Sequence, residues 1–80
     1  MITQNITGKL VTVKRLNNSI NGNPNYKLEL VTDNDVIIEV TTLNDSMVNY
    51  TLGYHLENKD VTLKVKVNRK SNKLLDIVEE

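Results

Sequence analysis

Basic side chains and asparagines are the residues of this chain whose types and positions could do chemistry. They fill or flank two polar segments, NNSINGNPN at 17–25 and NRKSNK at 68–73. Lysine and arginine bind phosphate oxygens, and side-chain amides add hydrogen bonds, so such a set suits a nucleic-acid backbone. The candidate nucleic-acid-binding residues are Lys14, Arg15, Asn21, Asn23, Lys64, Lys66, Arg69, Lys70 and Lys73.

The net charge of zero conceals a separation of charge along the chain. Residues 9–27 carry four basic side chains and no acid, and residues 28–58 carry six acids and no Lys or Arg. Residues 59–73 carry six basic side chains and one acid, and residues 74–80 carry three acids. Blocks of this kind form either solvated faces or a functional patch.

Metal and enzyme chemistry are not indicated by the remaining residues. His55 is the single histidine and there is no cysteine, so the spacing supports neither a zinc site nor a Ser-His-Asp relay. Gly8-Lys9 lacks the upstream glycine of a phosphate-binding loop. We interpret His55 as a surface residue, and we expect a non-enzymatic protein without cofactor or metal.

Acidic residues are best explained by strands and turns. Asp33-Asn34-Asp35 lacks the calcium-loop spacing and lies between two predicted strands, which favours a hairpin turn. Glu29 and Glu39 face outward on those strands and are expected to solubilise the sheet.

Five segments show the alternation or composition of β-strands, at 6–16, 26–31, 36–41, 61–67 and 74–78. The first alternates imperfectly, so either both of its faces are partly covered or a bulge switches them. Gly8 is the expected bulge or bend point. The segments 17–25 and 68–73 are predicted to be loops.

The stretch 42–56 decides the architecture. Asn44 or Asp45 could cap a helix of about two turns around 44–53, and Gly53 would end it. The alternation of apolar residues over 48–56 favours a strand instead. We predict the helix, and a strand here would exclude the fold proposed next.

Three strands, a short helix and two strands form the order of the oligonucleotide/oligosaccharide-binding (OB) fold, a five-stranded Greek-key barrel. An SH3-like barrel or an open sheet with one helix is the alternative. In an OB barrel, loops 17–25 and 68–73 would flank one groove and gather the basic residues at one pole.

The outward faces of the second and third strands argue for a different partner. Their side chains include no aromatic ring, whereas single-strand binding surfaces generally stack bases on such rings. Val31 and Ile37 would instead form a small apolar patch for a protein partner or for self-association.

The strings LNNSINGNPNY (16–26), KLELVTDND (27–35) and TTLNDSMVNYTLG (41–53) resemble small proteins of Gram-positive phages and mobile elements. In those proteins a strand precedes an Asn-Gly-Asn-Pro loop with an aromatic residue, and a short acidic-capped segment follows. The resemblance implies a mobile-element origin, and it implies no activity or site residues.

The chain is expected to be one OB-like domain over residues 1–80 in the cytoplasm. It has no apolar run approaching ~18 residues, and its first residues lack the layout of a signal peptide, so no membrane partner is expected. Two functions are predicted: binding of single-stranded nucleic acid at the basic pole, or binding of a protein at the second and third strands.

Overall fold

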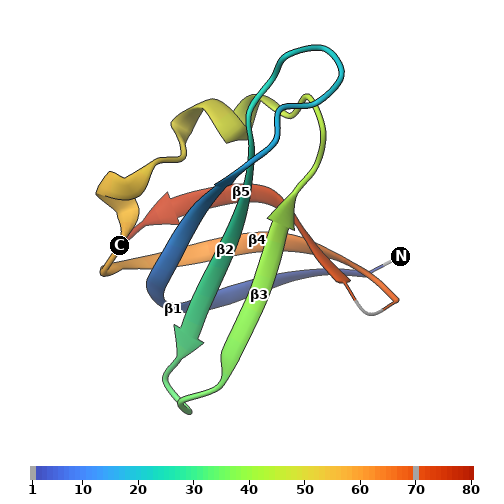
Figure 1. Cartoon of the computed structure of the whole chain (residues 1–80). Coiled ribbons are helices and arrows are strands. Elements are labelled where there is room, and N and C mark those ends of the chain that lie inside the picture. The colour runs from blue at the N-terminus through green and yellow to red at the C-terminus, as the bar shows by residue number, and fades with distance from the viewer. Residues whose placement is uncertain (1, 70) are drawn as a thin grey trace.

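Five strands close into one barrel (Figure 1). The computed structural model describes residues 2–69 and 71–80. The elements are β1 (Ile2–Leu16), β2 (Asn25–Thr32), β3 (Ile37–Thr42), the 3-10 turns η1 (Met47–Thr51) and η2 (Tyr54–Leu56), β4 (Lys59–Asn68) and β5 (Ser71–Glu79). The strand order is β1-β2-β3-β5-β4, and β4 returns to β1. This confirms the predicted OB-like barrel.

The bend in β1 lets one strand serve both halves of the barrel (Figure 1). Gly8, Lys9 and Leu10 pair with β2 on one side and with β4 on the other. A Cβ atom on Gly8 would lie 2.3 Å from the carbonyl oxygen of Val31, so only glycine allows β1 and β2 to approach this closely.

A β-bulge at Val11 explains the imperfect alternation of β1. The register with β2 shifts between Leu10 and Thr12, which leaves Val11 exposed and turns Val13 inward. A bulge is therefore confirmed, although it lies at Val11, whereas Gly8, predicted as a bulge or bend point, pairs with both β2 and β4 where β1 bends. Gly8 permits close packing, and the extra residue lies three positions later.

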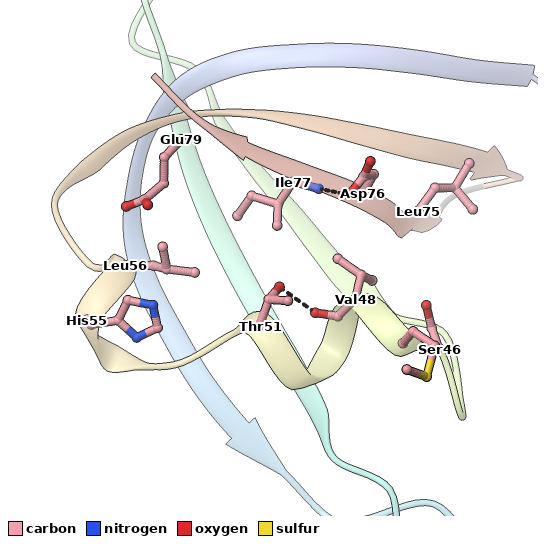
Figure 2. Close-up of a pocket in the computed structure, with 10 residues that line it drawn as sticks. Ser46, Val48, Thr51, His55, Leu56, Leu75, Asp76, Ile77 and Glu79 are labelled. Atoms are coloured by element: carbon pink, nitrogen blue, oxygen red, sulfur yellow. Dashed lines mark hydrogen bonds between the residues drawn. The ribbon is translucent and has the colours of Figure 1, made fainter.

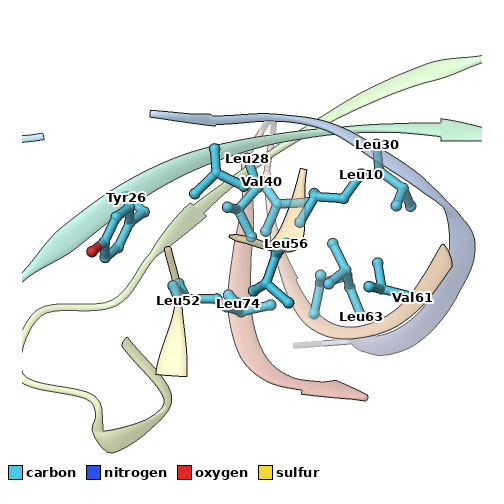
Figure 3. Close-up of a cluster of buried hydrophobic side chains, with 12 residues drawn as sticks. Leu10, Tyr26, Leu28, Leu30, Val40, Leu52, Leu56, Val61, Leu63 and Leu74 are labelled. Carbon is cyan, nitrogen blue, oxygen red and sulfur yellow. The ribbon is translucent and has the colours of Figure 1, made fainter. Parts of the chain in front are cut away.

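Regular alternation on β2 and β4 fills the barrel with aliphatic side chains (Figure 3). Burying each such side chain stabilises the fold by roughly 1.5–3 kcal/mol, so the core needs no disulfide. The buried apolar residues are Leu10, Val13, Tyr26, Leu28, Leu30, Val40, Leu52, Leu56, Val61, Leu63, Val65 and Leu74.

The predicted helix around 44–53 is two short 3-10 turns. Ser46, not Asn44 or Asp45, occupies the N-cap position of η1, and it makes no side-chain capping bond. Leu52 and Leu56 are buried in the core, and the strand alternative for 48–56 is wrong. No helix of the described residues is long and apolar enough to cross a membrane.

The hairpin connection between β2 and β3 is tight. Asp35 has a φ of 61°, and its N–H donates to the Thr32 carbonyl at 2.9 Å, as expected for a turn at 33–35. β4 and β5 form the hairpin predicted at 68–73, but these bounds are too wide, because Asn68 pairs with Ser71 and both residues lie on strands. Lys73 therefore lies on β5.

Replacing Gly8 with alanine tests the close approach of β1 to β2. We expect Gly8→Ala to lower the free energy of unfolding by about 1–3 kcal/mol, because the backbone of Val31 must move. Urea denaturation measures this, with Lys9→Ala at the exposed neighbour as the control. A Gly8→Ala protein as stable as the control would show that β2 accommodates the methyl group.

Candidate nucleic-acid interface

Four lysines on four strands form one row across the outside of the barrel. The pairs are Lys14 with Lys27, Lys27 with Thr41, Thr41 with Lys73, and Lys73 with Lys66. Directly opposed residues share one face of a sheet, and each of these residues has a buried core residue next to it in sequence: Val13, Tyr26 and Leu28, Val40, Leu74 and Val65. We call Lys14, Lys27, Lys73 and Lys66 the lysine row.

The sheet fixes the spacing of the lysine row. Adjacent strands lie about 4.8 Å apart, so the four steps from Lys14 to Lys66 follow a curved path of about 19 Å. The Nζ of Lys73 donates a hydrogen bond to Oγ1 of Thr41 at 2.8 Å. Lys73 also borders a shallow depression of about 420 Å³ between β3 and β5.

Two acids lie beside Lys27 in the lysine row. Glu29 and Glu39 are directly opposed on β2 and β3, and an Oε2 of Glu39 lies 3.6 Å from Nζ of Lys27. Among the described residues, this is the only salt bridge, so Lys14, Lys66 and Lys73 have no carboxylate partner at that range.

Arg15 lies at the end of the barrel and is held by its neighbours. Its guanidinium carbon is 5.3 Å from the centroid of the Tyr26 ring, and Nη1 donates to the Tyr26 hydroxyl at 3.3 Å. Nη2 donates to Oδ1 of Asn18. This cation–π contact positions Arg15 beside loop 17–25.

Asp45, in the segment after β3, accepts hydrogen bonds from Ser19, Asn21 and Asn23 of loop 17–25. We call these bonds the Asp45 latch. The Asp45 carboxylate accepts from the Ser19 hydroxyl at 2.6 Å and from the side-chain amides of Asn21 at 2.8 Å and Asn23 at 2.6 Å. These bonds, that of Ser19 first, lower the pKa of Asp45 below its ordinary value of 3.8. The side-chain amides of Asn21 and Asn23 thus donate to Asp45, and their contact with nucleic acid stays a prediction.

Asn49 anchors the same region from inside. Its buried side-chain amide donates to the carbonyls of Pro24 at 3.0 Å and Leu43 at 2.7 Å. The hydroxyl of Tyr50 donates to Oδ1 of Asn23. The segment 43–51 thus acts as a scaffold for loop 17–25.

The other predicted residues lie at different places around the barrel. Lys64 is exposed on β4, two residues from Lys66, and is opposed by Asp76. Arg69 lies in the β4–β5 turn with a φ of 54°, and Lys70 lies outside the described residues. Val31 and Ile37 are directly opposed on β2 and β3 with Ile37 65% exposed, and their role in protein binding stays a prediction.

The sequence predicts that loops 17–25 and 68–73 lie at one end of the barrel, but their described residues lie apart. Loop 17–25 extends from the top of β1 and β2 in Figure 1, while the end of β4 and the start of β5 lie at the lower right. The side chains of loop 17–25 bond to Arg15 and to the segment 42–50. The lysine row crosses the surface between them.

Lys27 is the residue that sequence reasoning missed. Alternation along β2 turns it outward, but its alignment with Lys73 depends on the parallel pairing of β3 with β5. No local sequence pattern predicts that register. Acidic residues follow Lys27 in the sequence, so counting charges along the chain does not reveal it as part of a basic surface.

Comparison with solved structures identifies a protein with the same fold as this chain. No protein-family model matches the chain, and no curated protein matches its sequence. Among solved structures, Rim1, a mitochondrial single-stranded DNA-binding protein from S. cerevisiae, aligns with a TM-score of 0.75. The identity is 17%, and the alignment covers 99% of this chain and 93% of the yeast chain. At this identity the likeness establishes a shared barrel fold.

Replacing Asp45 tests the latch. We expect Asp45→Asn to speed hydrogen exchange at the backbone amides of Ser19, Gly22 and Asn23, whose bonds close the loop. Because folding lowers the pKa of Asp45, its carboxylate is charged and accepts these hydrogen bonds above pH 3.8. The bonds are lost as the pH falls through the pKa of Asp45 in the folded protein, which lies below 3.8. The wild-type loop should then exchange like Asp45→Asn.

Amide exchange measured by NMR across this pH range provides the readout, with Asp33→Asn in the distant β2–β3 turn as the control. Unchanged protection in Asp45→Asn would show that the remaining bonds to the loop, such as those of Asn49 and Tyr50, suffice to hold it.

Proposed function

We propose that this protein is a small non-enzymatic module, of phage or mobile-element origin, that binds single-stranded nucleic acid along the lysine row. The observation that carries the proposal is the strand register, which aligns Lys14, Lys27, Lys73 and Lys66 on one surface of a protein whose net charge is zero. The described function of the yeast protein with the same fold supports it.

The lysine row is suited to binding the phosphates of a nucleic acid rather than its bases. The outward residues of β2 and β3 near the row include no aromatic ring, and Tyr26 is buried under Arg15. Without stacking, binding depends on lysines replacing counterions along the backbone. The protein should therefore tolerate many base sequences.

The curvature of the row favours a single strand over a duplex. The lysines lie on successive strands around a closed barrel, so their ammonium groups do not share one plane. A single strand can bend along this path, whereas duplex DNA is stiff over about 150 base pairs and would reach only part of it.

Removing two lysines of the row tests the proposed surface. For Lys27→Gln/Lys73→Gln we expect weaker binding of a labelled oligothymidylate and a smaller salt dependence. On single strands, the slope of log K against log salt should fall by about 0.7 for each phosphate that is no longer neutralised by a lysine. Fluorescence anisotropy at several salt concentrations measures both.

The matched control is Lys9→Gln/Lys59→Gln, which removes the same charge from exposed positions outside the row. Equal weakening by the two double variants would mean that general charge, not the row, attracts the oligonucleotide. No binding by the wild-type protein at low salt would refute the proposed function.

Neutralising Glu39 should change binding in the opposite direction. Glu39 competes with phosphate for Lys27, so Glu39→Gln is expected to tighten binding and to steepen its salt dependence. Asp33→Gln, which makes the same charge change in the β2–β3 turn, is the control. Weaker binding by Glu39→Gln would contradict a path over Lys27.

A further inference from the structure

One edge of β5 lacks a strand partner over most of its length. β3 pairs with β5 only at Lys73 and Leu74, and β4 pairs with the opposite edge. From Leu75 to Glu79, no other described strand lies along the first edge. The N–H of Ile77 instead donates to Oδ1 of Asp76 at 2.9 Å, a bond that an incoming strand could replace.

A groove of about 670 Å³ runs between this edge and the two 3-10 turns. Val48, Leu56, Leu75 and Ile77 give it apolar walls, and Met47 beside them is 80% exposed. Figure 2 shows the Ile77 side chain pointing from β5 toward Val48 and Thr51. We call this the β5 groove.

Charge restricts what the β5 groove can bind. Asp76 and Glu79 line it, and no described Lys or Arg does. These carboxylates repel a nucleic-acid backbone, which separates the groove from the lysine row. Pairing of two copies through this edge would bring two sets of the same carboxylates together, so a second copy is disfavoured.

We propose that the β5 groove binds an extended segment of a partner protein in which apolar and basic side chains alternate. The segment would pair with Leu75–Glu79 as an added strand and would bond to the Ile77 N–H. Its apolar side chains would contact Val48, Leu56 and Ile77, and its basic side chains would face Asp76 on the opposite face of β5. This inference is independent of the proposed function.

A synthetic peptide of alternating lysine and valine, labelled with fluorescein, provides the probe. We expect it to bind the full-length protein, with NMR shifts confined to η1, η2 and Leu75–Glu79 and with slower exchange of the Ile77 amide. A peptide of the same composition with its lysines and valines in two blocks, and one with glutamate in place of lysine, should not bind.

Met47→Lys and Asp76→Lys should weaken binding of the alternating peptide about tenfold or more, as is typical for truncating a residue at the centre of an interface. Both positions are exposed, so the fold should remain intact, which circular dichroism verifies. Val36→Lys, which adds the same single charge as Met47→Lys at a 52% exposed position in the distant β2–β3 turn, should keep full affinity.

Three results would overturn the proposal: no binding of the alternating peptide, equal binding of the block peptide, or unchanged affinity in both groove variants. A dimer in sedimentation, with amide shifts at Leu75–Glu79 in the absence of peptide, would also overturn it by assigning the edge to a second copy.

Discussion

The closure of the barrel between β3 and β5 is the contact on which both proposed surfaces depend. Thr41 pairs with Lys73 and Thr42 with Leu74, in parallel, and the pairing then stops. This short contact places Leu74 in the core beside the other strands and brings Lys73 into line with Lys27. Because β3 ends at Thr42, the rest of β5 has no residue of β3 to pair with, and its edge beside the 3-10 turns stays open.

Polar side chains, rather than helical capping, organise the segment between β3 and β4. Asn44 forms no cap, and its Oδ1 accepts from the Asn25 side chain at 2.8 Å, while Asp45 binds loop 17–25. The buried amide of Asn49 joins two backbone carbonyls from separate segments. Side chains used in this way cannot cap a regular helix, which is consistent with the two short turns observed.

The barrel converts charge blocks along the chain into separate surfaces. The basic blocks at 9–27 and 59–73 are distant in sequence, but β1, β2, β4 and β5 carry them onto one row. The acidic residues near the C-terminus, Asp76 and Glu79, lie instead on the part of β5 whose edge is unpaired. A neutral protein can therefore present one surface suited to phosphates and another suited to cations.

Local patterns in the sequence determined the strands, the turn at 33–35, the inward residues of β2 and β4, and most lysines of the row. These follow from the period of two in a strand and from turn chemistry, both of which act over a few residues. Only the tertiary structure decided that Lys27 joins Lys73, that Asn21 and Asn23 bond to Asp45, that Lys73 lies on a strand, and that Gly8 packs against Val31. Those outcomes depend on the register between strands that are distant in sequence, which is set when β1 bends and the barrel closes. The residues of one segment alone do not determine that register.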